Sequence, residues 1–317
     1  MTFLVTLPML SIIIPTKQRE NIFYETVIAL DQALQFFNYD YEVIIVNNDD
    51  KSLSIALPSD FKLINCNTGG VAAARNMGAK YANGNILLFL DNDILISSES
   101  LKKGYEYFIN LSKLNDKMVL NFNWVYPQNI YDKLTQKPFG RYILYYGFDK
   151  YEGKAWTDTT FDKNNEYIKT HMFISCAFFI KQSIFSQIEG YNENFKFAGY
   201  EDNDFKEKLI KNNIEIYLLP NIYVYHNEKD YLDLKKFLER KYRSAYTRKQ
   251  AVDLGDDDLL LQHSIFKKFF LTIIWSLRNF FISFVNNFFK SKKFDFITFK
   301  IIDALLAAYI YKGYNSK

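Results

Sequence analysis

The chain has 317 residues, of which 49% are hydrophobic and 24% are charged, so it can bury one large core or one and a half ordinary domains. Its two cysteines, Cys66 and Cys176, lie far apart and lack a C-x-x-C partner, which argues against a disulfide framework or a cysteine-based zinc site. The formal net charge of +3 is uneven, because residues 264–317 carry nine Lys or Arg against two Asp, or +7, which leaves −4 for the rest. This asymmetry predicts an anionic surface as partner of the tail, and we expect no nucleic-acid partner.

The first ten residues, MTFLVTLPML, have no basic leader and carry Pro8 within a short apolar run. A secretory signal has a positively charged start followed by a longer apolar stretch. We therefore expect the folded body of the chain to be cytoplasmic, in the reducing setting that the cysteine content favours.

Short apolar runs alternate with helical patterns over the first hundred residues. The runs at 10–14, 41–46, 61–64 and 86–90 are rich in β-branched residues, which favours buried strands. Helical patterns cover 21–37, 71–81 and 98–111, with Gly78 as the interior breaker of the second. The alternation predicts an α/β fold, with a mostly parallel sheet that has helices on both faces. A largely irregular, aromatic-rich stretch is expected over 121–170, followed by an ordered block over 171–226.

Each predicted strand of this first part ends in a polar cluster. The clusters occupy 15–17, 47–50, 65–70 and 91–93. Since the carboxyl ends of parallel strands meet at one edge of an open sheet, where such folds bind ligands, the four clusters together indicate a binding site. Solvated loops would explain any single cluster, but they explain four clusters less well when these include a Gly-Gly turn and paired carboxylates.

Asp91 and Asp93 follow the most apolar of these strands. Two carboxylates spaced in this way on a loop can bind one hard divalent cation together with diphosphate oxygens. D-x-D pairs are common by chance, so it is the position after a buried strand that favours metal binding here. His226 ends a later strand-like segment. A lone histidine is more often structural, but this one is a candidate third ligand.

A second acidic cluster, Glu201, Asp202 and Asp204, begins a predicted helix after an aromatic and glycine-containing turn. The positive end of a helix favours carboxylates, so ordinary capping explains part of the cluster. Three acids within four residues exceed what capping requires. One of them could deprotonate an acceptor hydroxyl.

The tail between residues 264 and 290 carries a polar residue at every third or fourth position. This spacing predicts one amphipathic helix, with Lys267, Lys268 and Lys290 near its ends, that lies on an anionic membrane surface. Its length would allow it to cross a membrane, but Arg278 and three asparagines argue against crossing. Docking on the body or on a second subunit is the alternative, and a companion helix is expected over 296–311.

Four strings of the sequence carry a family resemblance. They are LSIIIPTKQR, YEVIIVNND, NTGGVAAARNMGAKYANGNILLFLDND and IEGYNENFKFAGYEDNDFKEKLIKNNIEIYLLP. In this order and spacing they resemble glycosyltransferase family 2, which has the GT-A fold, and the last string also resembles a galactosyltransferase-like carboxyl-terminal segment. The resemblance covers residues 9–228. It implies transfer of a sugar from a nucleotide diphosphate donor, but it does not identify the sugar.

The resemblance also implies roles for individual residues. The nucleotide sugar would be bound by residues at the strand ends, namely Pro15, Thr16, Arg19, Asn47, Asp49, Gly70, Arg75, Asp91 and Asn92. A Mn²⁺ or Mg²⁺ ion would be held by Asp91, Asp93 and His226. Asp202 would be the catalytic base, and we assign acceptor binding to Tyr200, Glu201, Trp124 and Trp156.

Two positions depart from the family pattern. Many relatives use an aspartate to accept the N3–H of uracil where this chain has Asn47, whose amide carbonyl can still accept that bond. Relatives usually have Tyr-Asn after Pro-Thr, and this chain has Lys17 and Gln18 there. We keep a UDP-sugar as the expected donor.

Together these patterns predict a GT-A catalytic domain over 1–230 and a helical, membrane-associated region over 231–317. Within the catalytic domain, 1–115 would bind the nucleotide and 116–230 the acceptor. The predicted activity is inverting transfer to a hydroxyl of a glycan or lipid-linked acceptor, in surface polysaccharide synthesis at the inner face of the cell membrane. A second copy of the chain is a further expected partner.

Two other functions stay open. A non-catalytic scaffold could bind a nucleotide sugar, although the presence of Asp93, Asp202 and His226 speaks against it. A nucleotidyltransferase also uses a sheet edge, carboxylates and a metal, but it would be expected to carry a glycine-rich, basic triphosphate loop, which residues 12–19 lack.

Overall fold

The computed structural model describes residues 9–67, 69–147, 164–195, 197–287 and 291–316, and the chain forms two compact units. The first unit comprises Met1–Val125, Asp158–Lys196 and Asp202–Asn227. The second comprises Tyr126–Thr157, Phe197–Glu201 and Glu228–Lys317. The second unit therefore takes in a segment, Tyr126–Thr157, that we expected in the acceptor-binding half of the catalytic domain.

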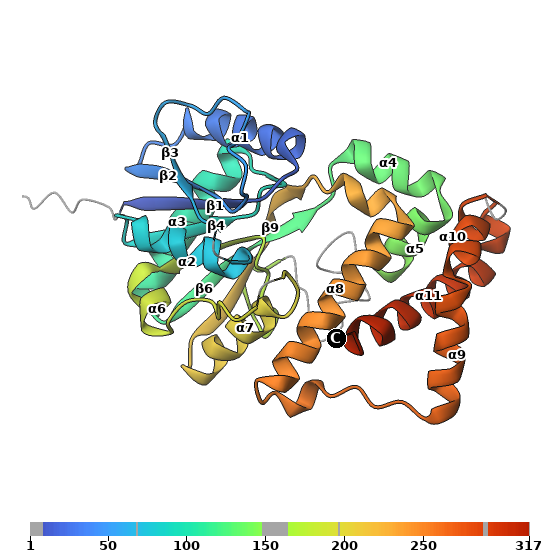
Figure 1. Cartoon of the computed structure of the whole chain (residues 1–317). Helices are drawn as coiled ribbons and strands as arrows, with labels where there is room; N and C mark the ends of the chain where they lie inside the picture. The colour runs from blue at the N-terminus through green and yellow to red at the C-terminus, as the bar shows by residue number, and fades with distance from the viewer. Residues whose placement is uncertain (1–8, 68, 148–163, 196, 288–290, 317) are drawn as a thin grey trace, which may run out of the picture. The chain divides into compact units, whose positions relative to one another are not determined.

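The first unit is built on a mixed sheet. Over the described residues this sheet has nine strands, in the order β3-β2-β1-β4-β8-β6-β9-β5, and β7 pairs with β9. Figure 1 labels β1 to β4, β6 and β9 of this sheet. The strands are β1 (Leu10–Thr16), β2 (Tyr41–Asn47), β3 (Phe61–Asn65), β4 (Ile86–Leu90), β5 (Ile94–Leu95), β6 (Met118–Val125), β7 (Ile168–Thr170), β8 (Ala177–Lys181) and β9 (Glu215–His226). The four strands predicted in the first ninety residues are all present.

The first four strands run parallel. β1 pairs with β2 and with β4, and β2 pairs with β3. β8 enters antiparallel between β4 and β6, whereas β6 and β9 are parallel. β1 and β4 are buried along their whole lengths, which is why their sequences are nearly continuous apolar runs. As predicted, the carboxyl ends of β1 to β4 lie at one edge of the sheet.

Helices cover both faces of this sheet. They are α1 (Glu20–Leu34), α2 (Val71–Tyr81), α3 (Ser98–Leu114), α6 (Gln182–Gln187) and α7 (Glu201–Lys211). Neighbouring residues of β8 show the two layers, because side chains alternate along a strand. Phe178 belongs to the core cluster formed with α2, α6 and α7, whereas Phe179 stacks on Phe108 of α3. The predicted α/β layering is confirmed.

Gly78 explains how α2 can lie so close to the sheet. A Cβ atom at this position would lie 2.3 Å from Cγ2 of Ile13 and 3.2 Å from Cγ2 of Val46. A glycine inside a helix costs about 1 kcal/mol relative to alanine, but here it permits close packing on β1 and β2. The close approach also brings Arg75, three residues earlier on α2, to the carboxyl edge of the sheet.

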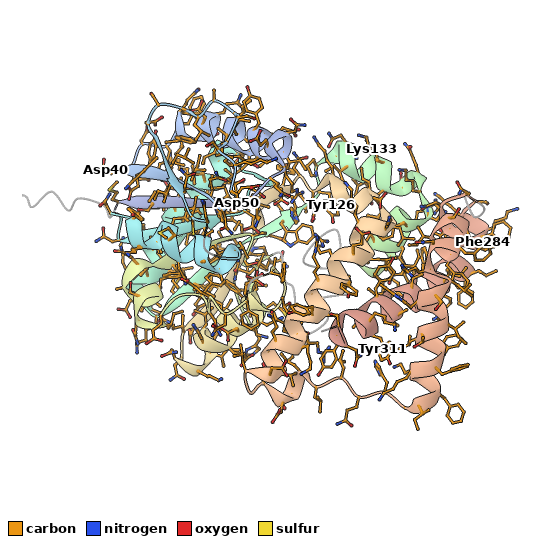
Figure 2. All side chains as sticks on the ribbon, viewed as in Figure 1. Asp40, Asp50, Tyr126, Lys133, Phe284 and Tyr311 are labelled. Atoms are coloured by element: carbon orange, nitrogen blue, oxygen red, sulfur yellow. The ribbon has the colours of Figure 1, made fainter. Side chains whose placement is uncertain are left out.

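The second unit is helical. Its helices are α4 (Gln128–Gln136), α5 (Pro138–Tyr146), α8 (Leu234–Asp253), α9 (Ile265–Ser276), α10 (Arg278–Asn287) and α11 (Asp295–Tyr314), with short 3-10 turns η2 (Lys229–Leu232), η3 (Asp257–Leu259) and η4 (Lys292–Phe294). α11 packs against α5, α8 and α9. Aromatic side chains such as Phe284 on α10 and Tyr311 on α11 are frequent in this unit (Figure 2). The expected companion helix in the tail is confirmed by α11.

The expectation of an irregular stretch over 121–170 is wrong for residues 128–146, which form α4 and α5. These helices are short and amphipathic. Ile130 and Leu134 are the buried residues of α4, and Phe139 and Ile143 are among those of α5. Pro138 stands in the first turn of α5, where a proline is tolerated because its missing N–H would have no partner inside the helix. Many tyrosines and polar residues conceal this pattern in the sequence.

The single amphipathic helix predicted between 264 and 290 is also wrong, because the chain breaks into α9 and α10, which are bent by 63°. Thr272 and Ser276 donate side-chain hydrogen bonds to carbonyls four residues earlier, an arrangement that bends helices. Arg278 then donates to the carbonyl of Trp275 at 2.8 Å, which caps the end of α9. No single helix among the described residues is long and apolar enough to cross a membrane, and α9 and α10 meet that test only as a bent pair.

Candidate active site

The loop after β4 is fixed to the end of β1. Nδ2 of Asn92 donates to Oγ1 of Thr16 at 3.0 Å, and Oγ1 of Thr26 on α1 donates to the carbonyl of Asn92 at 3.0 Å. Thr16 is buried, as is Pro15 beside it in β1. Asp91 and Asp93, on either side of Asn92, are therefore held at the carboxyl edge of the sheet.

Arg75 connects two carboxylates that are far apart in the sequence. Its side chain is 3% exposed, with Nη2 2.9 Å from Oδ1 of Asp91 and Nη1 3.1 Å from Oδ1 of Asp202. The guanidinium also lies over the ring of Tyr191, 4.9 Å from its centroid. A planar guanidinium offers several donors in fixed directions, so it can hold two carboxylates at once. Arg75 thus brings the D-x-D loop and the acidic helix together.

The position of Asp202 is set by the anchoring of α7. Phe205, three residues further on, is fully buried and stacks on Tyr191 with ring centroids 4.1 Å apart. Oγ of Ser175 donates to Oδ2 of Asp202 at 2.6 Å, so both oxygens of this carboxylate accept hydrogen bonds. Ser175 was missed in the sequence, where nothing distinguishes it from any other serine before a strand.

Asp93 is the most enclosed of the acidic residues at this edge, with 5% exposure. Its Oδ2 lies 3.0 Å from Nη1 of Arg19, and its Oδ1 lies 3.4 Å from Nε2 of His226. Burial by itself would raise the pKa of Asp93, but His226 and Arg19 lower it below the ordinary value of an aspartate. The carboxylate is therefore ionised and available as a ligand.

Arg19 reaches Asp93 from a strained backbone. Gln18 and Arg19 have φ angles of 56° and 61°, which is the left-handed region, where residues other than glycine are uncommon. Such a conformation costs roughly 1–2 kcal/mol for each residue and persists only when its surroundings enforce it. Here Arg19 is also the N-cap of α1, and its carbonyl accepts the amides of Ile22 and Phe23.

His226 ends β9 and pairs with Ile94 of β5, which begins directly after Asp93. The ring of Trp124 meets the imidazole edge-on at 5.2 Å, and Trp124 is 8% exposed. Trp124 thus supports His226 from the side. Within the first unit, Asp93 and His226 can each offer a ligand atom to a metal ion.

The turn after β2 uses much of its own hydrogen-bonding capacity. Asn47 is 1% exposed, its amide group donates to the carbonyl of Lys51 and to Oδ1 of Asn65, and its side-chain oxygen accepts from the backbone N–H of Asp49. A carbonyl oxygen has two lone pairs, so one acceptor position remains. Nδ2 of Asn48 donates to the carbonyl of Gly69 at 2.8 Å and so fixes this turn to the loop before α2.

Gly70 is the N-cap of α2 and has an extended backbone with φ −77° and ψ −167°. It has no side chain over the first turn of the helix, and this first turn contains no acidic residue. The N-terminal amides and the helix dipole favour an anion at such a position. Gly70 therefore suits the place of a phosphate-binding residue at the sheet edge.

The other predicted acceptor residues, Tyr200, Glu201 and Trp156, are not among the described residues of the first unit. Tyr200 and Glu201 belong to the second unit. There Glu201 is 2% exposed and accepts a hydrogen bond from the N–H of Gly199, while the ring of Tyr200 lies under the guanidinium of Arg248 at 6.0 Å. Trp156 lies outside the described residues.

The concentration of negative charge in the first unit changes the protonation of its members. Burial raises the pKa of Asp91, with further increases from Asp93 and Asp202 that Arg75 opposes. Burial, followed by the same three carboxylates, raises the pKa of Cys176 well above its ordinary value. Cys176 is therefore an uncharged core thiol. Both Cys66 and Cys176 are free and buried.

We predict that Arg75→Met lowers the free energy of unfolding by about 3 kcal/mol at pH 7, because two partly buried carboxylates lose their counter-charge. Without Arg75 the pKa of Asp91 would rise further, so the folded variant would bind more protons than the unfolded one. Its stability would then fall as pH rises and recover toward pH ~4, near the ordinary pKa of a carboxyl group. Urea unfolding at the two pH values measures this, with Arg75→Lys as a charge-conserving control. An equal loss at both pH values would assign the effect to packing on Tyr191 instead.

Two protein-family models match parts of this chain. The model for glycosyl transferase family 2 matches residues 11–189, and a model described as the N-terminal domain of galactosyltransferase matches residues 157–230. The chain is 31% identical over 108 residues to a poly(ribitol-phosphate) beta-glucosyltransferase of Bacillus spizizenii, which covers 31% of this chain and 17% of that protein. It is 33% identical over 107 residues to the minor teichoic acid biosynthesis protein GgaB of Bacillus subtilis, covering 31% and 12%.

The fold also has solved counterparts. A crystal structure of GalNAc-T7 with UDP, GalNAc and Mn²⁺ matches 77% of this chain and 51% of that one, with a TM-score of 0.50 and 11% sequence identity. At this identity the likeness concerns the fold, and the α/β unit described above is a GT-A fold. Because the family model covers more than half of its residues, the chain belongs to glycosyltransferase family 2.

Proposed function

We propose that this protein is an inverting glycosyltransferase that moves a sugar from a UDP-sugar to a hydroxyl group of a glycan or lipid-linked acceptor. One observation carries the proposal. Asp93 and His226 form a pair suited to a cation, and Arg75 holds Asp91 and Asp202 beside each other at the same edge of the sheet. Cation, donor and base would then occupy one edge.

The cation would be Mn²⁺ or Mg²⁺, held by Asp93 and His226, with Asp91 as a further ligand. Carboxylate oxygens suit both ions, and an imidazole nitrogen in the set favours Mn²⁺. GalNAc-T7, which shares the fold, binds Mn²⁺ together with UDP. When bound, the ion stabilises the negative charge that develops on the departing diphosphate.

The nucleotide would lie over the turns after β1, β2 and β3. Asn47 has one acceptor position left for the N3–H of uracil. Thr16 and Asp49 stand at the same strand ends, and Gly70 leaves the N-terminus of α2 open to a phosphate oxygen. Arg19 would move its hydrogen bond from Asp93 to a diphosphate oxygen, because phosphate and carboxylate oxygens are alternative partners of a guanidinium.

Asp202 would take the proton from the acceptor hydroxyl. Arg75 and Ser175 orient its carboxylate and leave a lone pair on each oxygen, and its side chain is 31% exposed. The acceptor oxygen would attack from the face opposite the diphosphate while Asp202 removes its proton. A single displacement of this kind inverts the anomeric carbon.

The acceptor class follows from relatives and from the tail. The two Bacillus proteins named above act, by their names, in poly(ribitol-phosphate) glucosylation and in teichoic acid biosynthesis, which supports surface polysaccharide synthesis as the setting. The tail, with its +7 charge, exposes Phe266 and Phe269 of α9, which are 88% and 68% accessible. Cationic and aromatic side chains on one helix suit the surface of an anionic membrane. We place the protein there, on the cytoplasmic face.

Removal of the metal ligand tests the cation site. Asp93→Ala should lower sugar transfer by about 10²-fold or more, and it should weaken binding of Mn²⁺ to the free protein, measured by electron paramagnetic resonance. Asp60→Ala, which removes an exposed carboxylate from the same unit, should change neither. Full transfer in excess EDTA would disprove metal dependence.

A set of isosteric changes identifies the base. Asp202→Asn keeps the size of the side chain but cannot accept a proton at neutral pH, so kcat should fall by at least about 10²-fold while donor affinity stays nearly unchanged. Asp204→Asn, which changes a carboxylate two residues further along α7 and 4.0 Å from Lys208, is the matched control. If Asp202→Asn kept a near-normal kcat while Glu201→Gln abolished it, the base would be Glu201. If the protein were a non-catalytic scaffold, the wild type itself would show no sugar transfer in this assay.

Membrane binding by the tail is tested with the exposed aromatics. The double variant Phe266→Ser, Phe269→Ser should bind anionic vesicles at least about tenfold more weakly than the wild type, because two phenylalanines no longer enter the interface. Phe36→Ser, which changes an exposed phenylalanine of the first unit that is 66% accessible, should have no effect. Equal vesicle binding by all three proteins would show that the exposed face of α9 packs against another protein.

A further inference from the structure

A cavity of about 570 Å³ lies within the second unit, between α5, η4 and α11. Pockets that bind small molecules have volumes of about 300–1,000 Å³, so this one is large enough for a headgroup-sized ligand. The lining residues on which its chemistry depends are Arg141, Tyr145, Lys292, Asp295, Phe296 and Lys300.

One ion pair forms the wall of the pocket. Nε and Nη2 of Arg141 on α5 bind the two oxygens of Asp295, at 2.8 Å and 2.6 Å. This bidentate pair joins α5 to the first residue of α11, and both side chains are mostly buried. Because the pair balances its own charge, Arg141 and Asp295 shape the pocket without giving it a net charge.

Two lysines supply the charge of the pocket. Lys292 on η4 and Lys300 on α11 are exposed, and Asp295 is the one carboxylate among the described residues that line the cavity. Lys300 lies 4.0 Å from Asp303, whose oxygens also accept hydrogen bonds from the hydroxyls of Tyr142 and Tyr146. Asp303 therefore offsets the charge of Lys300 only in part. The described residues that line the pocket therefore carry a net positive charge.

Aromatic side chains stand beside this positive charge. Phe296 is 75% exposed and Tyr145 is 53% exposed, and the ring of Tyr145 lies 5.3 Å from that of Phe299. A free phosphate ion would leave Phe296 in water, whereas a ligand with both a phosphate and an apolar part would contact both sets of groups. α10, which adjoins α9, contacts both α5 and α11. The pocket and the exposed aromatic face of α9 thus belong to one helical assembly.

We propose that this pocket binds the phosphate-bearing headgroup of one anionic phospholipid at a membrane surface. Lys292 and Lys300 would bind the phosphate oxygens, and Phe296 and Tyr145 would contact the glycerol and the first methylenes of the chains. The proposal deepens the proposed membrane association, on which it rests. In addition to the general attraction of the tail to anionic lipid, the pocket would recognise a single lipid molecule.

The experiment uses the full chain and a short-chain phosphatidylglycerol below its micelle concentration, so that no membrane surface is present. The Lys292→Gln, Lys300→Gln variant should bind this monomeric lipid about 30-fold more weakly, from about fivefold for each lysine near a phosphate. The matched variant Lys267→Gln, Lys268→Gln loses the same charge from α9, outside the pocket, and should keep its affinity within about twofold. Phosphatidylcholine of the same chain length and inorganic phosphate are the competing ligands.

The proposal predicts that phosphatidylcholine and inorganic phosphate both bind more weakly than phosphatidylglycerol. Inorganic phosphate that binds equally well would reduce the pocket to a simple anion site and overturn the proposal, as would equal losses in the two lysine variants. Failure of the pocket is separable from failure of membrane association, because wild-type binding to phosphatidylglycerol vesicles without monomer binding refutes the pocket alone. UDP affinity, unchanged in both lysine variants, shows that the candidate donor site is unaffected.

Discussion

The first unit has to offset the mutual repulsion of three carboxylates that lie close together. Asp91, Asp93 and Asp202 converge at one edge of the sheet, where burial raises the pKa of Asp91 and repulsion from Asp93 and Asp202 raises it further. Arg75 binds two of these carboxylates, and Arg19 and His226 bind the third. The electrostatic arrangement that stabilises the folded chain is also the one on which the proposed binding of a cation and a diphosphate rests.

Packing in the core delivers these groups to the edge. Gly78 lets α2 lie against β1 and β2, and so fixes the depth of Arg75. The guanidinium of Arg75 lies over the ring of Tyr191, and that ring also stacks on Phe205 of α7. The aromatic core therefore sets the distance between Arg75 and Asp202. Strain is accepted at Gln18 and Arg19, where the left-handed backbone aims a cation at Asp93. Chemistry and packing therefore depend on the same few contacts.

The second unit follows different physical rules. Its helices combine buried aromatic contacts with exposed phenylalanines and lysines, and its breaks come from local hydrogen bonds, such as that of Arg278 to the end of α9. Exposed aromatic and cationic groups favour binding to an anionic membrane surface, because the aromatic rings enter the interface and the cations are attracted to the lipid headgroups. We infer that the first unit holds the reaction and the second determines where it takes place.

The sequence by itself determined what is encoded within a few neighbouring residues. The strands β1 to β4, the helix α2, the polar strand ends and the acidic residues Asp91, Asp93 and Asp202 were all evident from period, composition and order. Tertiary structure alone decided that Arg75 bridges Asp91 and Asp202, that Ser175 serves Asp202, and that the tail bends near Leu277. Local patterns record which face of an element is apolar. Which distant side chains meet depends on how closely whole elements pack, and no single segment contains that information.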